Sequence, residues 1–140
     1  MVYDKMKWHY QGDYPQNMPM ENAGTHIGMF LAWCIINNLV GEDHLEDSVN
    51  ELKQVKDRKI TGRDFLIDMC DECFTDDDLN DEGNAFAEFY YAPDDSPYFD
   101  DYFKVFGLNA KTIYEAENTW ENFDKLKPII DKRYTDWKQQ

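Results

Sequence analysis

The stretch that decides the fold is the longest apolar run of the chain, Ile27-Gly28-Met29-Phe30-Leu31-Ala32-Trp33-Cys34-Ile35-Ile36. Its apolar side chains recur at spacings of three and four residues, which is typical of a helix with one buried face. The positions that follow this spacing are Ile27, Phe30, Leu31, Cys34 and Ile35. The run has about half of the length that a membrane span requires. It therefore predicts a core helix of a soluble domain.

The sequence on both sides of this helix predicts a single all-α domain over residues 1–140, with about six helices. Residues 1–21 contain several aromatic residues and two prolines, and they predict an irregular lead-in. No run of apolar and polar alternation predicts a β-strand. Start signals and apolar spacing place the other helices over residues 44–58, after Thr61, after Thr75, after Ser96-Pro97, and from about Thr119 to Trp137.

Composition limits the cellular compartment and the classes of partner that we expect for this protein. Three cysteines are an odd number, which does not suit a disulfide framework. The N-terminal residues have no apolar run after their charges, so we expect no signal peptide. A pI near 4.3 disfavours binding to nucleic acid or to anionic lipid. We expect a cytoplasmic protein, a monomer or weak dimer, without a nucleic-acid or membrane partner.

Nearly all of the net charge of −15 comes from one segment, the acidic tract from Asp64 to Phe103. It holds fourteen carboxylates and no Lys or Arg, whereas the rest of the chain has fifteen acids and fourteen bases. Ten aromatic residues are interleaved with these acids, and disordered acidic segments are poor in aromatics. Solubility needs a net charge of only about two to eight. The tract therefore predicts a folded acidic surface that attracts basic proteins.

We expect this surface to bind a basic protein, with carboxylates that speed the encounter and aromatic residues that supply affinity. Some of these acids also suit the solvated faces and first turns of helices, which is their plainer interpretation. The residues predicted to contact the partner are Asp76, Asp77, Asp81, Glu88, Tyr91, Asp94, Asp95, Tyr98, Asp100 and Asp101.

An alternative site lies along one edge of the apolar helix. Polar side chains there, together with two from the lead-in, could form a small pocket with a histidine as general base. This pattern is compatible with a small enzyme or a ligand-binding domain, although a half-buried polar seam is the plainer interpretation, since a lone histidine at a helix edge is more often structural than catalytic. The residues of this alternative pocket are His9, Asp13, Asn22, His26, Trp33 and Asn37.

Two motifs resemble metal sites, but neither is complete. Cys70 and Cys73 form a C-x-x-C motif, yet neighbouring acids oppose the lowered thiol pKa of a redox pair. A structural zinc site also needs two more ligands, and only Cys34 and three scattered histidines remain. A calcium-type loop that starts at Asp78 has Phe89 at its twelfth position, where a bidentate Glu is required. We therefore predict no metal, no cofactor and no catalytic residues.

A set of motifs that is distinctive enough to be specific spans nearly the whole chain. It includes Tyr3-Asp4-Lys5, Trp8-His9-Tyr10, Gly12-Asp13-Tyr14-Pro15, residues 22–28, Ile60-Thr61-Gly62, Glu82-Gly83-Asn84 and Thr119-Trp120-Glu121-Asn122. These motifs resemble an uncharacterised family of small acidic bacterial proteins, which in size and acidity is similar to immunity proteins that neutralise the toxins of interbacterial competition. Together with the acidic surface, the resemblance implies an inhibitor of a basic, nuclease-type toxin. A close variant of the acidic-surface hypothesis is a DNA mimic that inhibits a nucleic-acid-binding complex.

Overall fold

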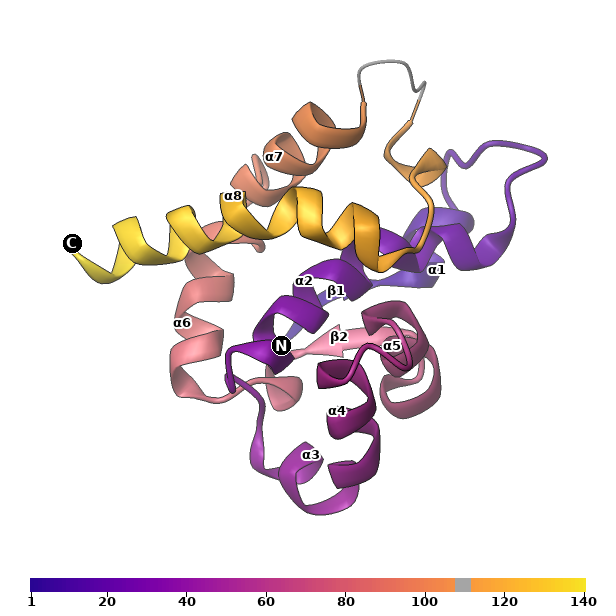
Figure 1. Ribbon diagram of the computed structural model, residues 1–140. Helices are drawn as coiled ribbons and strands as arrows, with labels where there is room; N and C mark the ends of the chain where they lie inside the picture. Colours follow the sequence, from indigo (N-terminus) through magenta and orange to yellow (C-terminus); the bar gives the residue numbers. More distant parts are fainter. Residues whose placement is uncertain (108–111) are drawn as a thin grey trace.

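The computed structural model describes residues 1–107 and 112–140, and this part of the chain forms eight α-helices and a two-stranded sheet (Figure 1). The prediction of a mostly helical single domain is confirmed, but six helices were too few and the strands were missed. The helices are α1 (Met6–Tyr10), α2 (Thr25–Ile36), α3 (Glu42–Asp47), α4 (Val49–Lys56), α5 (Gly62–Cys70), α6 (Asp81–Tyr90), α7 (Pro97–Phe106) and α8 (Trp120–Lys138). The strands are β1 (Val2–Lys5) and β2 (Cys73–Thr75), and the 3₁₀ turns are η1 (Met20–Gly24), η2 (Asp76–Asp78) and η3 (Ile113–Glu115).

Helix α2 is the centre of the core, as the apolar run predicts. Every residue from Thr25 to Ile35 is buried, so the helix is enclosed on all sides rather than on one face. It packs most closely on α5, where Gly28 and Gly62 bring the two backbones together. A Cβ atom on Gly62 would lie 2.8 Å from the Cβ of Ala32, closer than real Cβ atoms approach. The absence of side chains at these two positions therefore sets the distance between α2 and α5.

The lead-in is more regular than predicted, because it contains β1 and α1. Strand β1 pairs antiparallel with β2, and the register is irregular between Val2 and Asp4. A bulge of this kind breaks the alternation of side chains. Tyr3 and Asp4 are consequently both buried, although they are neighbours in a strand. A carboxylate thus enters the core from a strand that has no alternating pattern in the sequence.

The helix predicted over residues 44–58 is divided at Ser48 into α3 and α4. The Ser48 hydroxyl lies 3.2 Å from Nδ1 of His44, and both side chains are buried. The backbone of Ser48 leaves helical geometry, with φ −124° and ψ 27°, and this residue separates the two helices. Helices α3 and α4 lie next to each other at the lower end of the molecule (Figure 1). His44 of α3 lies 2.7 Å from Asp78 of η2.

Several predicted start signals are confirmed in atomic detail. Thr61 and Asp64 form the capping box of α5, and Ser96 caps α7 with Pro97 at the first helical position. Thr119 caps α8. Thr75, by contrast, caps η2, and α6 begins later under an Asn80 cap. The acidic segment after Thr75 is therefore a tight 3₁₀ turn between β2 and α6, and not the first turn of a helix.

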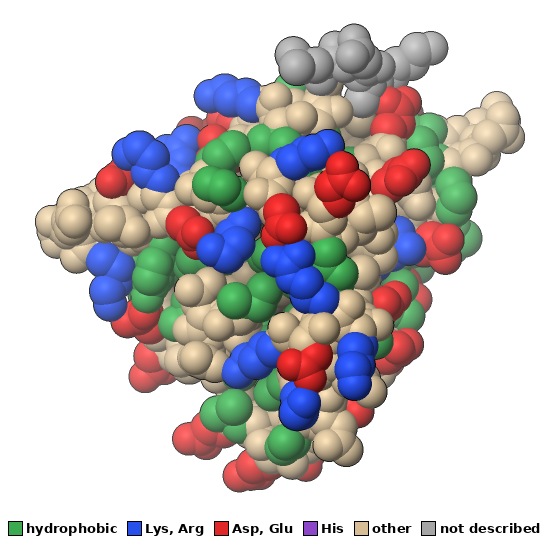
Figure 2. Space-filling view, in the orientation of Figure 1, with side chains coloured by type: hydrophobic (Ala, Val, Ile, Leu, Met, Phe, Trp, Pro, Cys, Tyr) green, Lys and Arg blue, Asp and Glu red, His purple; other side chains and the backbone are tan. Residues whose placement is uncertain are grey.

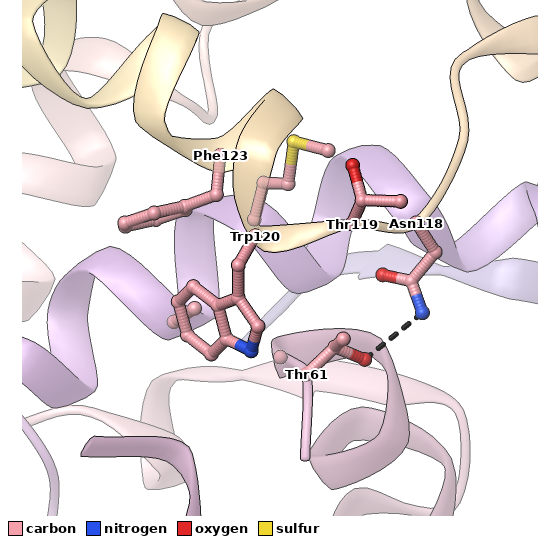
Figure 3. A pocket seen from close by; sticks show the side chains of 8 residues that line it. Thr61, Asn118, Thr119, Trp120 and Phe123 are labelled. Atoms are coloured by element: carbon pink, nitrogen blue, oxygen red, sulfur yellow. Dashed lines mark hydrogen bonds between the residues drawn. The ribbon is translucent and has the colours of Figure 1, made fainter. Parts of the chain in front are cut away.

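Helix α8 lies across α2 (Figure 1), and its side chains bond to residues from several other parts of the fold. Trp33 Nε1 donates to Asp131 at 2.8 Å, and Arg58 makes a bidentate pair with Asp124. Near its start α8 leaves a hollow of about 10 Å³ against α2 and α5, where Asn118 donates to Thr61 at 2.9 Å (Figure 3). A space of this size holds at most about one water molecule, so we do not regard it as a ligand site.

Candidate functional site

Three acids of the tract line a cleft between α3, η2 and the start of α6. This acidic cleft has a volume of about 560 Å³. Among the described residues, its walls carry five carboxylates and no Lys or Arg: Glu42, Asp43, Asp76, Asp77 and Asp81. The remaining lining residues are Asn38, Val40, Gly41, Leu45, Leu79, Asn80 and Asn84. Three of the predicted partner-binding residues thus lie together in one concave surface.

The walls of the acidic cleft are held together by backbone contacts. Val40 forms an isolated bridge with Leu79, and Gly41 N–H donates to the Asp78 carbonyl at 3.0 Å. A Cβ atom on Gly41 would lie 2.5 Å from the Asp77 carbonyl oxygen, so glycine permits this close approach. Asn80 N–H donates to the Leu39 carbonyl at 3.0 Å. These bonds fix the position of η2 relative to the segment that leads into α3.

A buried side-chain pair locks α3 onto the same turn. His44 Nε2 lies 2.7 Å from Asp78 Oδ1, and each residue is only 7% exposed. The other Asp78 oxygen accepts from Thr75 N–H at 2.8 Å. Glu42 and Asp43 are therefore presented by a helix that is anchored directly behind the cleft. These two residues lie outside the acidic tract, and nothing in the sequence indicated that they would line the same cleft as Asp76, Asp77 and Asp81.

The carboxylates of the cleft differ in their surroundings. Asp77 and Asp81 are exposed, whereas Asp76 is half-buried. Asp76 Oδ1 accepts from the Met1 ammonium at 2.9 Å, and this hydrogen bond lowers the pKa of the Asp76 carboxyl. Leu45, on the rim, is 56% exposed, and Val49 nearby on α4 is 57% exposed. The cleft therefore combines negative charge with exposed apolar surface on one side.

Other predicted acids are exposed but lie outside the lining of this cleft. Glu88 is near the end of α6, Asp94 and Asp95 are in the connection to α7, and Asp100 is on α7. The face in Figure 2 carries Lys and Arg side chains mixed with Asp and Glu, while acidic side chains project at its lower margin, where α3 lies in Figure 1. The acidic surface is therefore several separate groups of charges.

Three of the predicted partner-binding residues are in the core, and the prediction of a surface role for them is wrong. Tyr91 and Tyr98 are 3% and 0% exposed. Their hydroxyls donate to Asp4 Oδ2 and to the His26 carbonyl. Asp101 is 5% exposed, accepts from Tyr90 at 2.7 Å, and pairs with Arg133 of α8 at 2.9 Å. Most of the interleaved aromatics belong to the core beneath the acids, whereas Phe89 and Phe103 are exposed.

The alternative pocket assembles only in part. His9 and His26 meet with ring centroids 4.6 Å apart, and Asn22 is near them because it donates to the carbonyl of Tyr114. Asp13 is exposed, and no described contact joins it to the two histidines. Trp33 and Asn37 lie further along α2, where Trp33 bonds Asp131 and Asn37 bonds the Trp33 carbonyl. The prediction that these six residues line one pocket is therefore wrong.

The residue that the alternative pocket lacked is Asp4. Its Oδ1 lies 2.7 Å from His9 Nε2, and its Oδ2 lies 3.4 Å from His26 Nε2. Burial alone would raise the pKa of the Asp4 carboxyl, but the neighbouring imidazoles of His26 and His9 hold it well below its usual range. Burial lowers the pKa of His26. The motif Tyr3-Asp4-Lys5 was visible in the sequence, but nothing in its spacing indicated that Asp4 faces the core.

The C-x-x-C motif has the surroundings of ordinary thiols. Burial raises the pKa of both Cys70 and Cys73, and the nearby Asp78 raises the pKa of Cys70 further. Such thiols are poor nucleophiles, which agrees with the prediction that this is not a redox pair. Cys70 nevertheless lies near His44 and Asp78, so the fold supplies two candidate ligands that the sequence placed far apart.

Comparison with known protein families gives a match over most of the chain. A family model described as a domain of unknown function, DUF7832, matches residues 2–116. This range includes the acidic cleft and Asp4, His9 and His26, whereas α8 lies beyond it. No curated protein and no solved structure matches the chain. Within the described residues, no helix is long and apolar enough to cross a membrane.

Proposed function

We propose that this chain, which belongs to the DUF7832 family of domains of unknown function, is a binding protein whose acidic cleft holds a basic segment of a partner protein. The observation that carries the proposal is the lining of that cleft, which has five carboxylates and no basic side chain. Like charges that share a concave surface repel one another and weaken the folded state. A cationic partner relieves this repulsion, which gives the arrangement a use.

The physical chemistry of the cleft suits fast and specific capture. Charges of one sign in a cleft concentrate the field and raise association rates by about 10 to 1,000 times for a partner of opposite charge. The cleft is held by backbone bonds and by the His44–Asp78 pair, so little conformational entropy is lost on binding. Leu45 offers an apolar contact on the rim and takes the anchoring role that the sequence gave to Tyr91 and Tyr98.

The basic partner that the sequence favours is a nuclease-type toxin domain, and the chain would then act as its immunity protein in the cytoplasm. Enzymes that cleave nucleic acid carry basic grooves, because they must hold phosphates. An acidic cleft on a monomer or weak dimer can cover such a groove. A DNA-mimic inhibitor of a nucleic-acid-binding complex would use the same chemistry. The two differ in the partner, so identification of the partner separates them.

The first experiment is capture of partners from the native cell with the tagged full chain. Two matched variants divide the acids by position: Asp77→Asn with Asp81→Asn inside the cleft, and Asp94→Asn with Asp95→Asn outside it. All four carboxylates are exposed, so both pairs remove two charges without disturbing the core. We expect the first pair to weaken binding of the captured basic protein by about tenfold or more, and the second by much less. Equal losses in the two pairs would count against the cleft.

A further inference from the structure

Three metal-ligating side chains meet at the junction of β1, α1 and α2. They are Asp4, His9 and His26, and their ligand atoms all lie within 4.8 Å of one another. Asp4 is 4% exposed and His26 is 1% exposed, while the His9 side chain retains 13% exposure at the edge. Two imidazoles and one carboxylate are therefore gathered where water has almost no access.

His26 is the residue that a plain structural interpretation does not explain. Within residues 1–107 and 112–140, neither of its ring nitrogens has a hydrogen-bond partner, although the ring is buried. Its ring contacts Phe99 edge-on at a centroid distance of 5.3 Å, but such a contact does not satisfy the nitrogens. Buried polar groups are almost always paired, and an unpaired one costs about 1–3 kcal/mol. The cost points to a missing partner for His26.

The separation of His26 from Asp4 suits a shared metal ion better than a hydrogen bond. His26 Nε2 lies 3.4 Å from Asp4 Oδ2, which is long for a hydrogen bond. Two ligand atoms on a tetrahedral Zn²⁺ stand about 3.3 Å apart, since each bond is about 2.0–2.2 Å. His9 Nε2 lies 2.7 Å from the other carboxylate oxygen, Oδ1, so His9 would exchange this hydrogen bond for a bond to the ion. His9 belongs to the short helix α1, and its side chain is at the partly exposed edge of the cluster.

His9 and Asp4 also have hydrogen-bond partners outside the cluster. Tyr114 Oη lies 2.7 Å from Nδ1 of His9, which leaves Nε2 directed at Asp4. Tyr91 donates its hydroxyl to Asp4 Oδ2 at 2.6 Å, and Lys5 N–H donates to Oδ1 at 2.9 Å. Metal-binding histidines and carboxylates commonly have such outer partners, which orient them and raise their affinity.

We propose that Asp4, His9 and His26 bind one divalent transition-metal ion of the Zn²⁺ type. Two imidazoles disfavour Ca²⁺ and Mg²⁺, which prefer oxygen ligands. Three protein ligands leave one tetrahedral position for water or for a group on a bound molecule. The proposal departs from the sequence prediction of no metal, because Asp4 is the ligand that the sequence did not place. It is independent of the acidic cleft, whose lining contains none of these residues.

A second cluster, formed by His44, Cys70 and Asp78, serves as an internal control. Its polar atoms have partners within the cluster or next to it: His44 pairs with Asp78 and Ser48, and Cys70 Sγ donates to Asp78 Oδ1 at 3.4 Å. It therefore lacks the unsatisfied nitrogen that distinguishes His26. It also contains a thiol, which gives a bound metal a different spectrum.

The test uses the full chain, stripped with a chelator and then titrated with Zn²⁺ alone under equilibrium dialysis. We expect one ion per chain, and binding at least about 100-fold weaker in His9→Gln, where a ligand is lost. Tyr114→Phe removes only an outer partner and should weaken binding by about 10- to 100-fold. Cys70→Ala should bind as the parent chain does. Circular dichroism of each metal-free variant separates loss of the ligand from loss of the fold.

Co²⁺ bound in place of Zn²⁺ gives a visible spectrum that depends on the ligands of the metal. A residue with only a structural role would not change this spectrum. Co²⁺ in the proposed site has nitrogen and oxygen ligands, so its spectrum should lack a thiolate charge-transfer band, and His9→Gln should abolish the visible bands. Three results would overturn the proposal: no saturable Zn²⁺ binding, binding that survives in His9→Gln but fails in Cys70→Ala, or a thiolate band with Co²⁺.

Discussion

The ion pair between Arg133 of α8 and Asp101 of α7 gives our most specific prediction about the free energy of unfolding, which concerns the variant Arg133→Ala. Arg133 donates to Asp101 from Nε at 2.9 Å and from Nη2 at 3.0 Å, and Tyr90 supplies the third hydrogen bond at 2.7 Å. The Asp101 side chain is 6% exposed, whereas Arg133 is 42% exposed. Removal of Arg133 leaves a buried carboxylate with one partner.

The magnitude lies between two limits. Breaking a fully buried ion pair costs about 3–5 kcal/mol, and losing an exposed pair costs about 0–1 kcal/mol. Because water reaches Arg133 from one side, we expect a loss of about 1.5–3 kcal/mol in the free energy of unfolding. With a urea m-value of about 1–3 kcal/mol/M, the unfolding midpoint should fall by roughly 1 M.

Urea unfolding followed by circular dichroism measures this loss, and Lys132→Ala is the matched control. Lys132 is the neighbouring residue on α8, and it pairs with Asp136 at 2.7 Å with both side chains largely exposed. That variant should lose at most about 0.5 kcal/mol. If the two variants lose the same stability, Asp101 is not the buried acceptor that this reasoning requires.

Three further predictions concern other parts of the fold. Gly62→Ala should lower the free energy of unfolding by at least about 2 kcal/mol in urea titrations, because the new Cβ would meet the backbone of α2; an unchanged midpoint would contradict the close approach of α2 and α5. Hydrogen bonds from Lys138 and Tyr134 lower the pKa of the Glu82 carboxyl. The contribution of ionised Glu82 to the free energy of unfolding is therefore complete above the unfolded pKa of about 4.3, and it is lost as the pH falls through the pKa of the folded state. The stability difference between the parent chain and Glu82→Gln should therefore shrink below about pH 4.3, and a constant difference in acid titrations would argue against these bonds. Cys70 should react with iodoacetamide at neutral pH at least about tenfold more slowly than free cysteine, since its pKa is raised; a rate equal to that of free cysteine would show that it is neither buried nor influenced by Asp78.

Local chemistry made much of the fold predictable. The cap at Thr61 with Asp64, and the Ser96-Pro97 start, depend on residues three or fewer positions apart, so the sequence contains the whole signal. The apolar spacing of residues 27–36 predicted a helix, but only the structure shows that it is buried on every side. The break at Ser48, which divides the helix predicted over residues 44–58, was not visible as a pattern in the sequence.

The sites were harder to predict, because they depend on residues far apart in the chain. Asp77 and Asp81 were predicted at the surface, but Glu42 and Asp43 join them only because His44 reaches Asp78. Tyrosine is common among interface anchors, but Tyr91 is a core residue. The number of aromatic residues in a segment does not tell which of them are buried. Asp4 is buried because the register of β1 is irregular, and no alternation of apolar and polar residues in the sequence indicates this irregularity.

The measurement that tests the central claim most directly is the association rate constant of the captured basic partner, followed across a range of salt concentrations. The acidic cleft predicts a rate that falls steeply as salt rises, since screening shortens the Debye length from about 30 Å at 0.01 M to about 8 Å at 0.15 M. It also predicts a shallower slope for the chain with Asp77→Asn and Asp81→Asn, but an almost unchanged slope with Asp94→Asn and Asp95→Asn. A rate that does not depend on salt, or a slope that changes equally in both variants, would contradict it.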